Sequence, residues 1–159
     1  MASRARAEEP VDPDAPVPVR GFGLPRTQVP VVAAVGLGGG LGALARYGIS
    51  QALPTEPGRF PWGTFTENVL GCLVIGVLMV LITEVWTAPR LLRPFLGVGV
   101  LGGFTTFSTY AVEFQKLLQQ GAAPLAFGYL ATTVLCALLA ALLGMWLARS
   151  AVLRRRRRP

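Results

Sequence analysis

Four long apolar segments alternate with short polar stretches along the chain. They cover residues of about 31–53, 63–85, 91–114 and 124–147. Each is close to the roughly 20 residues that a helix needs to cross about 30 Å of hydrocarbon. Because the connections are short, consecutive helices are expected to run antiparallel and to pack together. The pattern predicts an all-α integral membrane protein, a four-helix bundle.

The composition agrees with a membrane protein, since 52% of the 159 residues are apolar and only 14% are charged. Residues 1–29 are rich in proline, arginine and acidic residues, which predicts a disordered arm before the transmembrane domain of residues 30–149. A basic tail, residues 150–159, follows it. Cys72 and Cys136 both fall within apolar segments, which favours buried small side chains over a disulfide framework.

Basic residues are distributed unevenly between the two faces that four spans create. An even number of spans puts both termini on one face, and the opposite face carries only Arg59 and Lys116. Because basic flanks stay cytoplasmic, both termini are expected inside the cell. The C-terminal arginine run could bind nucleic acid, but beside a membrane exit it is more simply an anchor that attracts anionic lipid. The basic residues on the terminal face are Arg4, Arg6, Arg20, Arg26, Arg90, Arg93, Arg149, Arg154, Arg155, Arg156, Arg157 and Arg158.

Catalytic and metal-binding side chains are scarce. The chain has no histidine, no cysteine pair at metal-ligand spacing and no close pair of carboxylates within one apolar segment, so an enzyme is not expected. Residues 97–102, GVGVLG, match a dinucleotide-binding pattern of glycines, but they lie inside an apolar segment rather than after a strand. Glycine pairs spaced four apart instead predict close helix packing in lipid; they are Gly36 and Gly40, Gly38 and Gly42, and Gly99 and Gly103.

A few polar residues inside the apolar segments must be buried against protein or water. Arg46 either extends to the membrane interface or places a positive charge at the mouth of an anion path. Asn68 either bonds a neighbouring helix or lines a pore. Tyr129 and Thr133 lie one helical turn apart, and their hydroxyls either bond their own helix or form a polar track.

Residues 101–110 read LGGFTTFSTY and contain the weakest helix formers of the third segment. Gly102 and Gly103 each cost about 1 kcal/mol relative to alanine in a helix. A helix break is therefore expected, and carbonyls freed at a break are good ligands for a hard cation. Phe107, Tyr110 and Phe114 fall on one stripe, which is either core packing or a row of ring edges facing an anion.

Three stretches together resemble the Fluc (CrcB-type) fluoride channels, small four-helix membrane proteins that form antiparallel dimers. They are residues 39–47, GGLGALARY, residues 63–64 with Asn68 and Gly71, and residues 102–110, GGFTTFSTY. The resemblance covers residues of about 31–148. It implies passive fluoride export down the electrochemical gradient, through two pores at the dimer interface, with a structural sodium ion on the two-fold axis.

The resemblance also implies roles for individual residues. Gly102 and Thr105 would bind sodium through backbone carbonyls, and Arg46 and Glu113 would lie in the vestibules. The chain departs from the family pattern at Tyr110, usually phenylalanine, and at Glu67, usually apolar. The implied pore residues are Asn68, Phe107, Tyr110, Ser108, Thr109, Tyr129 and Thr133.

The uneven basic residues bear on the partner that the resemblance implies. An antiparallel homodimer needs one chain to insert in both orientations, which a strong basic bias opposes. The sequence therefore favours an oppositely oriented paralogue over a second copy as the partner. Two other classes stay open: a small proton-coupled multidrug exporter, which would need a carboxylate in the first segment, and a non-conducting membrane assembly partner.

Overall fold

The computed structural model describes residues 28–85 and 89–156, with side chains through Arg154. Within these residues every regular element is helical. The elements are α1 (Val29–Ala52), α2 (Trp62–Val80), η1 (Leu81–Val85), η2 (Pro94–Val100), α3 (Leu101–Phe104), α4 (Ser108–Gln119) and α5 (Ala123–Arg156). The segments η1 and η2 have the wider π-helical hydrogen bonding.

Within residues 28–85 and 89–156, four helical stretches are long and apolar enough to cross a membrane, which confirms for this part of the chain the prediction of an all-helical protein with four spans. They are Val29–Ala52, Trp62–Val85, Pro94–Gln119 and Ala123–Arg154. The third joins η2, α3 and α4. Most of the predicted N-terminal arm lies outside the described residues. The predicted basic tail begins inside α5, because that helix continues to Arg156.

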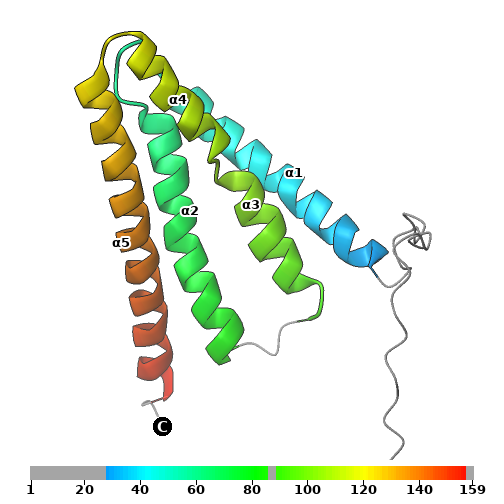
Figure 1. The fold of residues 1–159 in the computed structure, drawn as a ribbon. Helices are drawn as coiled ribbons and strands as arrows, with labels where there is room; N and C mark the ends of the chain where they lie inside the picture. The colour runs from blue at the N-terminus through cyan, green and yellow to red at the C-terminus, as the bar shows by residue number, and fades with distance from the viewer. Residues whose placement is uncertain (1–27, 86–88, 157–159) are drawn as a thin grey trace, which may run out of the picture.

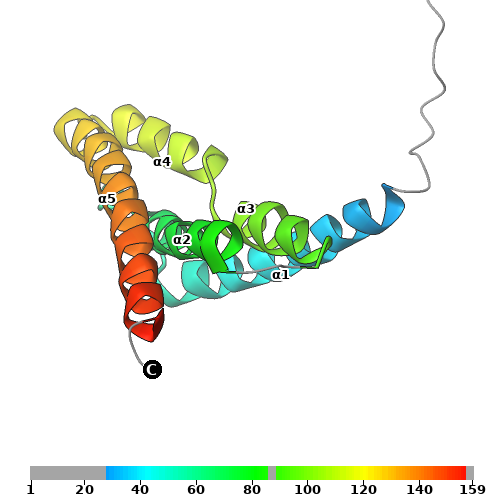
Figure 2. The ribbon, with the colours of Figure 1, turned by 90° about the horizontal axis from the view of Figure 1, so that it is seen from below.

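The helices pack as two pairs, α2 along α5 and α1 along η2 and α3, while α4 reaches across to α5 (Figures 1 and 2). The loops of residues 53–61 and 120–122 lie at one end of the bundle, here called the loop end. The start of α1, the end of α2, the start of η2 and the end of α5 lie toward the other, here called the terminal end. Consecutive spans therefore run antiparallel.

Glycines allow the first and third spans to touch backbone to backbone. A Cβ atom on Gly38 or Gly42 would collide with backbone atoms of η2, and one on Gly103 would collide with the carbonyl oxygen of Gly39. Gly36 and Gly40 have no atoms near the corresponding position, so the expected packing role of that pair is wrong within this chain. Small residues at such crossings let helices approach closely in lipid.

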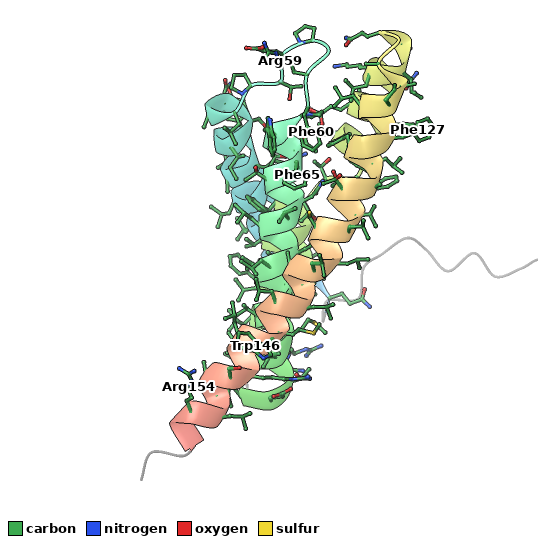
Figure 3. The ribbon with its side chains drawn as sticks, turned by 90° about the vertical axis from the view of Figure 1, so that its left-hand side faces the viewer. Arg59, Phe60, Phe65, Phe127, Trp146 and Arg154 are labelled. Carbon is green, nitrogen blue, oxygen red and sulfur yellow. The ribbon has the colours of Figure 1, made fainter. Side chains whose placement is uncertain are left out.

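A cluster of buried and partly buried side chains lies near the loop end, where Phe60, Phe65, Tyr110 and Tyr129 pack together. Figure 3 shows Phe60 and Phe65 in this region, whereas Trp146 and Arg154 lie toward the terminal end. Most large side chains of α5 are exposed, Trp146 among them. An apolar exterior of this kind is stable in lipid rather than water.

Candidate functional site

The backbone leaves helical geometry between α3 and α4, in the middle of the third span. Phe104 ends α3, Thr105 is extended with φ −80° and ψ 155°, and Ser108 begins α4. Non-helical backbone at membrane depth is stable only where protein or a wet cavity satisfies its polar groups. The partners of these groups therefore define the chemistry of the site.

Asn68 of α2 holds the interrupted backbone through both ends of its side-chain amide. Its Nδ2 donates to the carbonyl oxygen of Thr106 at 3.0 Å, and its Oδ1 accepts from the amide N–H of Thr106 at 2.9 Å. This pairing fixes the orientation of the amide. In the reverse orientation Nδ2 would face the N–H of Thr106, donor against donor, and Oδ1 would face its carbonyl oxygen, acceptor against acceptor. One Nδ2 hydrogen remains for another acceptor.

The hydroxyl of Thr106 closes the start of α4. It accepts from the amide N–H of Thr109 at 3.2 Å and donates to Thr109 Oγ1 at 3.0 Å, and it lies 3.3 Å from Ser108 Oγ. Sequence reasoning did not single out Thr106. The available signal was a threonine three residues before another hydroxyl residue at a helix start, a pattern that satisfies free helical N–H groups.

These side-chain bonds divert two N–H groups from the helical pattern. In a continuous α-helix, the carbonyl of Gly102 would accept from Thr106 and the carbonyl of Thr105 from Thr109. Both N–H groups donate instead to side chains, those of Asn68 and Thr106. The carbonyl oxygens of Gly102 and Thr105 are thus released from these two bonds and left available to another ligand.

A cavity of about 370 Å³ lies beside the interruption and is mostly apolar, with several polar atoms. Thr133 of α5 contributes a hydroxyl that is buried, with 4% of the residue exposed, and that has no hydrogen-bond partner among the described residues. A buried unpaired hydroxyl costs free energy and so points to a missing ligand or water. The lining residues are Asn68, Gly71, Cys72, Ile75, Gly97, Leu101, Gly102, Thr105, Thr106, Phe107, Tyr110, Thr133, Val134 and Ala137.

Two aromatic rings from the start of α4 also line this cavity, but their environments differ. The ring centroids of Phe107 and Tyr110 are 5.9 Å apart. Phe107 is 80% exposed, whereas Tyr110 is buried against Tyr129. The Tyr110 hydroxyl donates to the carbonyl oxygen of Leu130 at 2.8 Å, so it is directed to the backbone of α5.

A second cavity, of about 340 Å³, lies toward the loop end and holds Arg46 of α1 and Glu67 of α2 together with Thr109. Glu67 accepts from Ser50 Oγ at 2.8 Å. Although Glu67 directly precedes Asn68, the two side chains line different cavities. The departure at Glu67 therefore does not place a carboxylate in the cavity of Asn68.

Glu113 of α4 joins the buried interior to the loop-end surface. One carboxylate oxygen accepts from Tyr129 Oη at 2.9 Å, and the other accepts from Thr55 Oγ1 at 3.3 Å. Tyr129 itself is fully buried. A third cavity, of about 290 Å³, lies here between the α1–α2 loop and α4, with Arg59 and Lys116 in its wall.

The structure distributes the predicted site residues over these three places. Tyr129 and Glu113 bond to each other beneath the loop end, and Arg46 and Thr109 share the second cavity. Ser108 lies outside the residues that line the cavities described here and contacts Thr106. The main cavity brings together Asn68, Gly102, Thr105, Phe107, Tyr110 and Thr133.

The fold and the site define a multi-pass membrane protein whose spanning region holds a mostly apolar cavity with a few polar groups in its wall, and polar groups at this depth mark substrate or ion pathways. Residues 33–145 match the sequence model of a family described as CrcB-like protein, camphor resistance. The chain belongs to this CrcB-like family.

Curated relatives are similar over most of their length. A protein of Nocardia farcinica named fluoride-specific ion channel FluC 2 is 61% identical over 119 residues, which are 75% of this chain and 85% of the relative. FluC 1 of Streptomyces coelicolor is 60% identical over 78% of this chain and 80% of its own length. The FluC of Magnetococcus marinus is 44% identical over 74% of this chain and 97% of its own length.

Proposed function

We propose that the protein is a fluoride-specific ion channel that lets fluoride leave the cytoplasm passively and so lowers its cellular concentration. The names of relatives up to 61% identical support this function. The observation that carries it is the unpaired, buried hydroxyl of Thr133 in the main cavity. A channel for a small, strongly hydrated anion must replace water with hydrogen-bond donors.

The main cavity offers such donors without offering a carboxylate. The remaining Nδ2 hydrogen of Asn68 and the hydroxyl of Thr133 would donate to fluoride. The rings of Phe107 and Tyr110 would present the positive edges of their quadrupoles. Ser108, Thr109 and Tyr129 would continue the polar track toward the loop end, where Arg46 and Glu113 line the vestibules.

Replacement of Thr133 by valine tests this function, because valine keeps the shape and removes the hydroxyl. Removing a buried hydroxyl without a protein partner should leave unfolding unchanged or raise its free energy by about 1 kcal/mol. Fluoride efflux from liposomes, measured with a fluoride electrode, should fall at least tenfold. Reduced flux in a stable variant identifies a functional donor, whereas wild-type flux would contradict the assignment.

We also propose a structural sodium ion held by the carbonyl oxygens of Gly102 and Thr105. Both carbonyls lose a helical partner at the interruption, and unwound backbone carbonyls are typical sodium ligands in membrane proteins. Sodium would draw the two interrupted segments together and raise the local potential for an anion. Two carbonyls are few for a hard cation, so a second chain would supply more.

Exchange of sodium for a larger organic cation tests the ion site. It should lower the thermal stability of the protein and slow fluoride efflux, and sodium should restore both. Unchanged melting and flux after full exchange would exclude a structural sodium ion.

We also propose an antiparallel dimer, which the open side of the main cavity supports. Phe107 is 80% exposed in the single chain although it lies in the middle of a span. A second chain would cover this ring and complete two pores. Basic residues at the terminal end, including Arg93, Arg149 and Arg154, support our proposal that both termini are cytoplasmic and that the partner is an oppositely oriented paralogue.

Mapping the orientation of the C-terminus separates the two kinds of dimer. When the chain is expressed alone, tag accessibility should show a single orientation, and conduction should require the paralogue. A mixed orientation with fluoride flux from the chain alone would establish a homodimer instead.

A further inference from the structure

Glu67 is a buried carboxylate that the proposed pore does not use. Only 1% of the residue is exposed, and Ser50 Oγ donates to its Oε1 at 2.8 Å. It lines the second cavity with Ala43, Arg46, Tyr47 and Thr109. A buried ionised carboxylate needs a compensating charge or several donors to remain charged.

Charged and titratable groups face Glu67 from every helix packed around it. Arg46 and Tyr47 come from α1 and line the same cavity. Glu113 of α4 adds a second negative charge nearby. Tyr129 of α5 also faces Glu67, with its hydroxyl bonded to Glu113. No ion pair within 4.0 Å joins Arg46 and Glu67 in the described part of the chain, so the two charges interact through the cavity rather than by contact.

The second cavity is joined to the interruption by a short chain of hydrogen bonds. Thr109 lines this cavity and bonds to Thr106, which is held by Asn68 in the main cavity. Glu67 is also the chain neighbour of Asn68, about 3.8 Å away between Cα atoms. A change of charge at Glu67 therefore acts on the potential at the proposed fluoride donors.

We propose that Glu67 controls fluoride conduction through its state of protonation, an inference that rests on the proposed channel function. The ionised carboxylate offsets the positive charge of Arg46 and repels fluoride. The protonated acid leaves Arg46 unopposed and admits fluoride to the donors at Asn68. Because protonation increases as the pH falls, conduction rises in acid and declines as the pH rises.

Electrical recording of fluoride current tests this control, because neutral hydrogen fluoride that crosses the lipid carries no current. The reconstituted channel, with its paralogue if conduction requires it, is recorded at equal pH on both sides, from mildly acidic to mildly alkaline. The wild-type current should increase at least tenfold in acid, because protonation removes a negative charge that repels the anion. Glu67→Gln should hold the high current at every pH.

Three further variants separate the charge of Glu67 from general damage. Arg46→Gln should lower the current and shift its dependence on pH toward higher pH, because the positive charge that favours the ionised carboxylate is lost. Ser50→Ala removes the donor to the carboxylate, so its current–pH curve should shift toward higher pH. Glu56→Gln, a control at the exposed loop end, should behave as wild type. A Glu67→Gln channel that responds to pH like wild type overturns the proposal.

Infrared difference spectra provide a readout that does not depend on conduction. Acidification should produce a carboxylic acid carbonyl band in wild type that is absent from Glu67→Gln and present in Glu56→Gln. If the wild-type protein carries no fluoride current at any pH, the proposed channel function fails. If current flows but the band is missing or invariant with pH, the role of Glu67 alone is refuted.

Discussion

Replacement of Asn68 by alanine removes both hydrogen bonds that hold the interruption in the third span. Thr106 then loses the partner of its N–H, at 2.9 Å, and the partner of its carbonyl, at 3.0 Å. The residue is only 7% exposed, so water cannot readily replace the amide. Each unsatisfied buried group costs about 1–3 kcal/mol, so the two together lower the free energy of unfolding by roughly 2–6 kcal/mol.

Thermal unfolding in detergent and fluoride efflux from liposomes measure the two consequences of Asn68→Ala. We expect a marked fall in melting temperature and at least a tenfold loss of flux in protein that remains folded. Thr83→Ala is a matched control. Thr83 lies in the same span as Asn68, and its exposed hydroxyl donates to the backbone carbonyl oxygen of Met79 at 2.8 Å. That control should change stability by less than about 1 kcal/mol.

One pair of results would refute both proposed roles of Asn68. If Asn68→Ala unfolds like Thr83→Ala and conducts like wild type, the amide neither holds the interruption nor donates to fluoride. Asn68→Asp keeps an acceptor for the Thr106 N–H but turns a second, charged acceptor toward the Thr106 carbonyl oxygen. We expect it to lose conduction and to lose stability as well, because neither the carboxylate nor the carbonyl supplies a proton.

Four other substitutions have expected outcomes. Tyr110→Phe removes the hydrogen bond to the carbonyl oxygen of Leu130 and should lower the free energy of unfolding by about 1 kcal/mol. Fluoride flux from liposomes should stay within about twofold of wild type. A tenfold change in flux would show that the hydroxyl serves the pore. Gly103→Ala should destabilise the protein by about 1–3 kcal/mol because its methyl group overlaps the carbonyl of Gly39. Gly36→Ala, which has open space for its methyl group, should instead raise stability by up to about 1 kcal/mol in the same thermal assay. Glu84→Gln breaks a partly exposed ion pair and should change stability by no more than about 1 kcal/mol.

The four spans could be predicted from the sequence because membrane length and hydropathy are local properties. The predicted segments begin and end within a few residues of the observed helices, apart from the ends of the third and fourth. Those helices extend into polar sequence: α4 continues to Gln119 and α5 to Arg156. Hydropathy cannot locate such ends, because a helix continues into water when its backbone bonds and side chains allow it.

The contacts that define the site could not be predicted in the same way. Asn68 and Thr106 are 38 positions apart, and their pairing depends on how α2 packs against the third span. Helical spacing puts Thr64, Asn68, Gly71, Cys72 and Ile75 on one side of the second segment. All of these except Thr64 line the main cavity. Spacing within one helix is local, whereas the partner on another helix is set by packing.

The hydroxyl of Tyr110 bears on whether the two proposed pores of a dimer are alike, because a polar group in the aromatic pair of one chain would make its pore differ from that of an unlike partner. In the sequence it suggests an extra polar group within an aromatic pore, but the structure directs it to the Leu130 carbonyl of α5. The ring of Tyr110 can therefore serve the same edge-on role as phenylalanine, and this substitution gives no reason for an unlike partner. That proposal now depends on the basic residues at the terminal end, because they act during insertion, before either pore exists.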